Sequence, residues 1–298
     1  MSRKKTKDRL ITGFILVLGT IARAMSNKSR VMFGRFIGDI LRLLSKSRSD
    51  ITLTNIKNAF PDKGGDWCSN VRDESYRNLG ITLVELLTFP YLSENKIHDL
   101  IKYENIELIN EANSRGKGII FMSGHFGNWE LLAYTAGLFS KIPITIVVKP
   151  QSNHFADEYL NEFRTRGGNK IVPMSKAART MIQALNNHEA VALLADQSAD
   201  WQKDIFVDFF GRPAATYEAP ARLALKYRSP LILGFAHRQK DYTYKVTLRE
   251  IDYSDLDNSP ESIIELTRRH VKILEENILL NPGLWAWQHK RWKHEPPK

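Results

Sequence analysis

The stretch GIIFMSGHFGNWE, residues 118–130, contains the features that decide the fold. Its first half, GIIFMS (118–123), is a short and continuous apolar run. Three similar runs follow along the chain: ITIVV (144–148), AVALLA (190–195) and PLILGFA (230–236). Runs of this kind, rich in Ile, Val and Leu, are typical of strands that are covered on both faces. The opening stretch therefore predicts a central strand that ends in a loop with a histidine.

Segments with helical spacing alternate with these strands. They lie at about 129–140, 154–166, 175–187 and 216–228, and a further helix is expected at 261–280. Alternation of this kind predicts an α/β fold with a mostly parallel central sheet flanked by helices. The segment YTYKVTLREI (242–251) alternates apolar and polar residues, so we expect an edge strand with one exposed face, for which an antiparallel direction is open.

The N-terminus has a different pattern. Basic residues precede the apolar run LITGFILVLGTIA (10–22), which Arg23 interrupts before the roughly 20 residues that a spanning helix needs. A membrane anchor, a cleavable signal peptide and a plain buried helix remain open for this run. Residues 33–44 continue with the spacing of an amphipathic helix, which favours an anionic membrane surface or packing on the core. We expect membrane-associating helices at 1–46 and a catalytic domain at 47–298. The basic residues that precede the apolar run are Arg3, Lys4, Lys5, Lys7 and Arg9.

Composition limits the class of protein. The chain has 298 residues with a formal net charge of +10, which favours anionic partners. A nucleic-acid-binding protein is not expected, because zinc-finger spacing, an RNP block and a clear basic stripe are missing. A metal hydrolase is not expected either, because the histidines show neither H-E-x-x-H nor close pairs. Cys68 is the single cysteine, so an intramolecular disulfide is excluded.

A candidate catalytic pair lies in the opening stretch. Sites in open α/β sheets form outside the carboxyl ends of the strands, and His125 directly follows such an end. Asn128 suits a helix N-cap, which puts Glu130 in the first helical turn. Glu130 is then expected to hold one imidazole nitrogen and leave the other free as a base. The simpler reading, a capped helix start with a structural histidine, stays open.

Several blocks also resemble a known family. GHFGNWE (124–130) resembles the H-x4-D/E block of the glycerolipid acyltransferases, in the form found in the lipid A biosynthesis (lauroyl and myristoyl) acyltransferases. Four further blocks agree in order: ITLTNIKNAFPD (51–62), FRTRGG (163–168), ADQ (195–197) with IFVDFFGRPAAT (205–216), and WAWQHKRWK (285–293).

The resemblance implies an acyltransferase that needs no cofactor or metal. It moves a fatty acyl chain from an acyl thioester, usually on acyl carrier protein, to a hydroxyl of a lipid A precursor. A lysophospholipid, aminolipid or other glycolipid acceptor is the alternative. His125 would be the base and Glu130 its support; the chain lacks a G-x-S-x-G nucleophile elbow, so direct transfer is expected. The expected location is the bacterial inner membrane, with the catalytic domain facing the cytoplasm and an anionic membrane surface as partner.

Residues for substrate binding follow from the same blocks. Arg164 or Arg166, or loop N–H groups near Gly124 and Gly127, are candidates for stabilising the oxyanion, and a solvated helix face is the alternative for the arginines. Asp196 and Gln197 are expected at the same sheet edge as His125. Aromatic residues are expected to line an acyl-chain channel or to be ordinary core. The basic C-terminus HKRWKH (289–294) is expected to meet phosphates, the membrane or solvent. The channel candidates are Trp201, Phe206, Phe209 and Phe210, and a tight turn is expected at Gly211, Pro213 and Ala214.

Overall fold

A computed structural model describes residues 2–296, with side chains described from residue 12 onward except that of Phe14. The basic residues that precede the apolar run therefore lie outside the described side chains. The α-helices are α1 (Ser2–Arg23), α2 (Asn27–Leu44), α3 (Lys46–Ala59), α4 (Gly65–Leu86), α5 (Glu94–Leu100), α6 (Glu107–Ser114), α7 (Trp129–Ser140), α8 (His154–Arg166), α9 (Ala177–Asn186), α10 (Ala219–Tyr227) and α11 (Pro260–Leu280). The strands are β1 (Ile101–Tyr103), β2 (Ile119–Ser123), β3 (Ile144–Val148), β4 (Lys170–Pro173), β5 (Ala190–Leu194), β6 (Ile205–Phe209), β7 (Arg212–Thr216), β8 (Leu231–Arg238) and β9 (Tyr244–Glu250).

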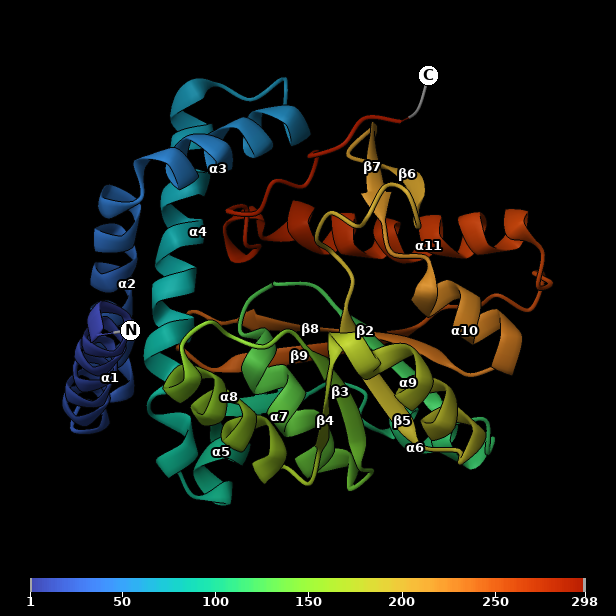
Figure 1. The fold of residues 1–298 in the computed structure, drawn as a ribbon, viewed down its shortest axis with the longest axis horizontal. Helices are drawn as coiled ribbons and strands as arrows, with labels where there is room; N and C mark the ends of the chain where they lie inside the picture. The colour runs from blue at the N-terminus through green and yellow to red at the C-terminus, as the bar shows by residue number, and fades with distance from the viewer. Residues whose placement is uncertain (1, 297–298) are drawn as a thin grey trace.

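The central sheet has seven strands in the order β1-β9-β8-β2-β5-β3-β4 (Figure 1). Every neighbouring pair is parallel except β8 and β9. The predicted mostly parallel α/β sheet and its four central strands are confirmed. The predicted edge position of 242–251 is wrong, because the three-residue strand β1 pairs with β9 and covers it. So short a strand has no periodic pattern that a sequence could reveal.

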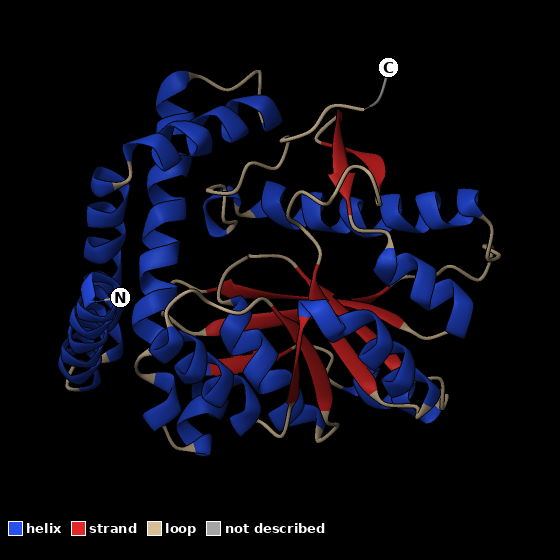
Figure 2. Cartoon of the chain, in the orientation of Figure 1, coloured by secondary structure: helices blue, strands red, loops and turns tan. Residues whose placement is uncertain are grey.

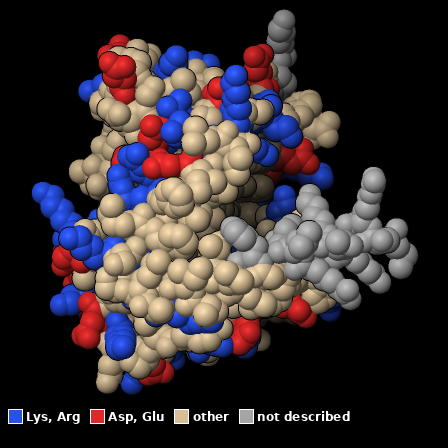
Figure 3. Space-filling view, turned by 90° about the vertical axis from the view of Figure 1, so that its left-hand side faces the viewer, with Lys and Arg blue, Asp and Glu red and all other residues tan. Residues whose placement is uncertain are grey.

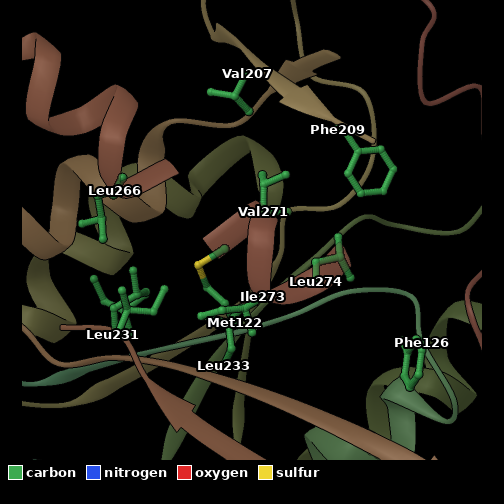
Figure 4. Packing of buried hydrophobic residues seen from close by; sticks show 14 of the residues in the cluster. Met122, Phe126, Val207, Phe209, Leu231, Leu233, Leu266, Val271, Ile273 and Leu274 are labelled. Carbon is green, nitrogen blue, oxygen red and sulfur yellow. The ribbon is translucent and has the colours of Figure 1, made fainter. Parts of the chain in front are cut away.

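Helices cover both faces of the sheet (Figure 2). Neighbouring residues of β2 point to opposite faces: Ile120 and Met122 join a core with α9, α10 and α11, whereas Ile119 and Phe121 join a core with α5 to α8. Figure 4 shows the first core, where Leu266 and Val271 of α11 lie above Met122 and Leu233 of the sheet. This two-sided burial explains why the central strands are continuously apolar.

The N-terminal helices lie beside α4 at one side of the sheet (Figure 1). Helix α2 meets α4 through glycines, since Gly34, Gly38 and Val31 are its buried residues. A Cβ added to Gly80 would lie 2.2 Å from the carbonyl oxygen of Gly34, so the two backbones are in direct contact. The apolar stripe expected at 33–44 is consequently not the buried face of this helix. In the described part of the chain, none of the helices combines the length and the apolar character needed to cross a membrane.

A small hairpin stands apart from the central sheet. Strands β6 and β7 pair in antiparallel fashion, with Phe209 opposite Arg212. Phe210 and Gly211 form the turn between them, with φ angles of 51° and 70°. Two positive φ angles are typical of a two-residue hairpin turn, which explains the glycine. The expected tight turn is confirmed at Gly211, but it is wrong for Pro213 and Ala214, which lie in β7 and pair with β6. The antiparallel pairing was not anticipated.

Candidate active site

The loop between β2 and α7 carries His125 at the carboxyl end of a central strand. Gly127 has a φ of 58°, and a Cβ there would lie 1.8 Å from the carbonyl oxygen of Ala236, so only glycine fits. Asn128 caps α7 by accepting a hydrogen bond from the Leu131 N–H at 2.9 Å. The predicted strand, loop and capped helix start are thus confirmed.

Asp196 is the residue that holds the imidazole. Its Oδ1 lies 2.8 Å from Nδ1 of His125, and its Oδ2 accepts the backbone N–H of His125 at 2.7 Å. A carboxylate at this distance accepts a hydrogen bond, so Nδ1 carries the proton and Nε2 is the unprotonated nitrogen of the neutral ring. The expected position of Asp196 beside His125 is confirmed, and its role as the direct partner of the ring is new.

The two side chains shift each other's ionisation. Burial lowers the pKa of His125, but the charge and hydrogen bond of Asp196 more than offset this effect, so the pKa lies above the ordinary value of 6.5. Burial raises the pKa of Asp196, yet the charge of His125 and three hydrogen bonds outweigh it, so that pKa is lowered. Each side chain therefore stabilises the charged form of the other.

A segment near the C-terminus completes this arrangement. Trp285 is buried and donates its indole N–H to Oδ2 of Asp196 at 2.8 Å. The segment also pairs with the loop that carries His125, because the N–H of Ala286 donates to the carbonyl oxygen of His125 at 2.9 Å and Phe126 bridges Trp285 in antiparallel fashion. The WAWQ block thus has a structural explanation that the sequence alone did not provide.

Glu130 has a different partner from the one expected. Its carboxylate forms a two-point ion pair with Arg164, at 2.7 Å and 2.5 Å, and both side chains are mostly buried. The expected hydrogen bond from the imidazole to Glu130 is therefore wrong, because Nδ1 of His125 donates to Asp196 and the Glu130 carboxylate is paired with Arg164. Glu130 still lies close enough for its charge to contribute to the raised pKa of His125.

The other predicted polar residues separate into two groups. Gln197 is at the site, since its Nε2 lies 3.4 Å from Nε2 of His125. Arg166 is directed elsewhere: it donates to the carbonyl oxygen of Pro90 and to Glu162, and its side chain is 40% exposed. The N–H of Gly127 donates to the carbonyl oxygen of Leu284, so it is already engaged.

An apolar cavity lies between α7 and the sheet, and the Glu130–Arg164 pair is part of its lining. Its walls come from α7 through Leu132, Ala133 and Ala136, and from the sheet. The polar residues Ser123, Glu130 and Arg164 line the same cavity. Further lining residues are Ile109, Phe121, Met122, Trp129, Ile144, Ile146, Val147, Val148, Ala192, Leu193, Leu194, Gly234 and Leu248.

None of the aromatic residues expected to form an acyl channel lines this cavity. Phe209 is fully buried in the core, 5.4 Å from the Trp285 ring, and Phe210 packs against Phe60 and Trp287. Trp201 is exposed. For Phe209 and Phe210 the alternative of ordinary core therefore agrees better with the structure, and a substrate contact of Phe210 or Gly211 stays a prediction.

The C-terminal basic block is not a simple exposed tail. Arg291 is 1% exposed, and its guanidinium donates to the carbonyl oxygen of Ala215 and to Oγ1 of Thr216, each at 2.6 Å. Asn55 in the 51–62 block donates to the carbonyl oxygens of Trp287 and His289. The 51–62 block and the 205–216 block, which are far apart in the sequence, therefore both bind the C-terminal segment and hold it against the site.

Fold and site together define an α/β enzyme whose candidate base lies at the carboxyl edge of a mostly parallel sheet. Residues 2–294 match the family model described as bacterial lipid A biosynthesis acyltransferase, and the chain belongs to this family. It is therefore an acyltransferase that acts on a lipid acceptor in lipid A biosynthesis.

Several curated proteins are similar over most of their length. A lipid A biosynthesis acyltransferase of Haemophilus influenzae is 26% identical, over a region that covers 85% of this chain and 80% of the length of that relative. The lipid A biosynthesis palmitoleoyltransferase of Escherichia coli is 23% identical over 88% of this chain and 84% of its own. A phosphatidylinositol mannoside acyltransferase of Mycobacterium tuberculosis is 22% identical over 63% of this chain and 58% of its own.

Proposed function

We propose that this enzyme transfers a fatty acyl chain from an acyl carrier protein thioester to a hydroxyl of a lipid A precursor, with His125 as the general base. The observation that carries the proposal is the bond between Nδ1 of His125 and Asp196, because it leaves Nε2 available to take a proton. A cavity lined mainly by apolar side chains lies beside the Glu130–Arg164 pair, and an apolar lining is what an acyl chain needs.

In the proposed reaction, Nε2 removes the proton of the acceptor hydroxyl while its oxygen bonds to the thioester carbonyl carbon. The tetrahedral intermediate then collapses, the carbon–sulfur bond breaks, and the imidazolium returns the proton to the leaving thiolate. The buried Asp196 stabilises the imidazolium through charge and hydrogen bonding. The side-chain amide of Gln197, beside Nε2, is the proposed donor to the oxyanion.

The Glu130–Arg164 pair has a supporting role in this mechanism. Glu130 stabilises the protonated ring of His125 by charge rather than by direct contact. Arg164 neutralises that carboxylate and borders the cavity, where it contributes a positive charge near the reacting carbonyl. Each residue of the motif thus has its own direct partner in this proposal: Asp196 for His125 and Arg164 for Glu130.

Residues 1–46 are proposed to dock on an anionic membrane surface. Figure 3 shows the face with α1 and α2, where a broad area free of charged residues is bordered by charged side chains of both signs, Lys and Arg among them. Large apolar side chains are exposed there, among them Val17, Phe36 at 59% and Leu44 at 79%. Exposed apolar area on helices of a chain with a net positive charge is typical of proteins that dock on an anionic lipid interface.

The proposed location is the bacterial inner membrane, with the catalytic domain of residues 47–298 on the cytoplasmic side. The proposed thioester donor is formed in the cytoplasm, which requires this orientation. The N-terminal helices would then lie at the interface and keep the site near its lipid acceptor.

The test is an assay of purified protein with acyl carrier protein thioesters of several chain lengths and a panel of lipid acceptors. We expect product with a lipid A precursor and loss of product in a folded His125→Ala variant. Transfer to a mannosylated phosphoinositide, a lysophospholipid or an aminolipid but not to the lipid A precursor would support the alternative acceptors. Transfer at the normal rate by His125→Ala would overturn the mechanism.

A further inference from the structure

Helix α4 carries a row of buried polar side chains on the side that meets the catalytic loop. Ser75, Asn78, Thr82 and Glu85 are spaced by three, four and three residues, so they share one face of the helix. We call this set the polar face of α4. None of the sequence blocks or the proposed chemistry gives these four residues a role.

Two of these residues bind the backbone of the loop. Thr82 Oγ1 and Asn78 Nδ2 both donate to the carbonyl oxygen of Gly127, at 3.1 Å and 3.0 Å. Asn78 Nδ2 also donates to the carbonyl oxygen of Leu284 at 3.0 Å. Since Gly127 is two residues from His125, these bonds fix the position of the backbone directly after His125.

Glu85 binds the next loop residue through its side chain. The buried carboxylate accepts a hydrogen bond from Asn128 Nδ2 at 2.8 Å, while Oδ1 of the same Asn128 caps α7. Tyr244 donates to Glu85 at 2.5 Å, and Arg238 lies within 3.4 Å. Asn128 is therefore fixed from both ends of its amide.

The polar face also binds the segment that supports Asp196. Ser75 Oγ donates to the carbonyl oxygen of Trp285 at 2.6 Å, and the indole of that tryptophan donates to Asp196. The same helix face thus holds the loop that carries His125 and the segment that orients its partner.

We propose that the polar face of α4 is the positioning element of the catalytic pair, with Thr82 and Glu85 setting the loop through Gly127 and Asn128. None of these four residues lines the cavity at α7, and their contacts go to the loop and the Trp285 segment, so their proposed effect is exerted through His125. The proposal rests on the proposed function of His125 as base. A displacement of about 1 Å in a reacting group can lower a rate roughly 100-fold.

Two variants remove single loop contacts and keep the rest of the helix. Thr82→Val removes the donor to Gly127 but keeps the shape of the side chain. Asn128→Ser keeps an N-cap oxygen but is too short to reach Glu85. Glu85 itself is less suitable, because its loss would leave Arg238 buried without a counter-charge.

Thr267→Val is the matched control. Thr267 is fully buried in α11, and its hydroxyl donates to the carbonyl oxygen of Ile263 in the same helix. Its loss should affect stability in a similar way without touching the loop. Thr82→Ser restores a hydroxyl and is the rescue variant.

The measurements are kcat, KM for the carrier thioester, and the pH profile of kcat/KM on protein shown to be folded by circular dichroism. We expect kcat to fall roughly 10- to 100-fold in Thr82→Val and Asn128→Ser with KM within about twofold. We also expect the acidic limb to move to lower pH, because a displaced His125 loses its bond to Asp196. Thr82→Ser should recover most of kcat.

Three outcomes overturn the proposal. They are kcat and a pH profile equal to those of Thr267→Val, a loss confined to KM, or no rescue by Thr82→Ser. If Thr82→Val does not fold, the result for Asn128→Ser decides. If the proposed function of His125 is wrong, the His125→Ala variant remains active. If only the positioning role is wrong, His125→Ala is inactive while Thr82→Val and Asn128→Ser are fully active.

Discussion

Asp196 binds His125 at two points, with Oδ1 at the ring Nδ1 and Oδ2 at the backbone N–H. This double contact fixes both the ring and the loop that carries it. Asp196 follows β5 and His125 follows β2, and these two strands are neighbours in the sheet. The proposed catalytic pair of His125 and Asp196 is therefore a direct product of parallel strand pairing.

The first prediction concerns this pair. His125→Ala should lower kcat by roughly 10²–10⁴-fold, because the base is removed. Asp196→Asn should also be severe, since an amide can hold the ring in the wrong tautomer and does not stabilise the imidazolium. Single-turnover acyl transfer with purified variants measures both effects, and a folded Asp196→Asn enzyme at full rate would rule out the role of Asp196.

The second prediction concerns pH. A base must be unprotonated to act, and the pKa of His125 is raised above 6.5. The acidic limb of kcat/KM should therefore lie above pH 6.5 in the native enzyme. Gln in place of Glu130 removes one of the charges that raise this pKa, so the limb should move to lower pH. An unchanged limb in Glu130→Gln would show that Glu130 does not act on the ring.

The third prediction separates the two arginines. Arg164→Ala leaves Glu130 buried without its partner, which should cost roughly 3–5 kcal/mol in the free energy of unfolding. Arg166→Ala removes an exposed ion pair, for which about 0–1 kcal/mol is expected. Denaturant unfolding measures both, and equal effects would contradict the assignment.

A combined variant tests what the charges do beyond stability. Arg164→Met with Glu130→Leu replaces the buried pair by apolar side chains, which should recover much of the lost stability. We expect acyl transfer to remain low in this variant. Recovery of both stability and activity would mean that the pair is structural only.

The fourth prediction concerns the cavity beneath α7. Ala136 lines its wall about two helical turns beyond Trp129, so Ala136→Phe should fill space that an acyl chain needs. Turnover of long-chain thioesters should fall by at least about tenfold relative to short-chain ones, because each excluded methylene loses about 0.8 kcal/mol of burial. A uniform loss over all chain lengths would place the acyl chain elsewhere.

The fifth prediction concerns stability in acid. Burial, followed by the charge of Arg291, lowers the pKa of His270 to about 3. Between pH 6.5 and about 3 the unfolded chain binds a proton that the folded His270 does not, so stability decreases as pH falls. The contribution is at most about 1.4 kcal/mol per pH unit. In His270→Leu, the free energy of unfolding from denaturant titrations should decrease less steeply between pH 7 and pH 4 than in the native protein. Identical pH slopes in the two proteins would contradict the role of His270.

Periodicity and strand composition were enough to predict the sheet. The four central strands and the helices at 129–140, 154–166 and 261–280 were located within a few residues, because apolar continuity and helical spacing are local signals. The strands β1 and β4 and the hairpin of β6 and β7 were missed. Their short segments have no pattern strong enough to separate them from loops.

The chemistry of the site divides along the same line. By itself the sequence determined that His125 lies at a strand end, that Asn128 caps a helix and that Asp196 and Gln197 reach the same edge, because residue order and parallel strands suffice for this. Only the tertiary structure decided which acid serves the histidine. Glu130 is near in sequence, but Arg164 of α8 takes both of its oxygens, while Asp196 on the neighbouring strand meets the ring. Partner choice among buried charges depends on distances across elements, and these are set by packing rather than by spacing along the chain.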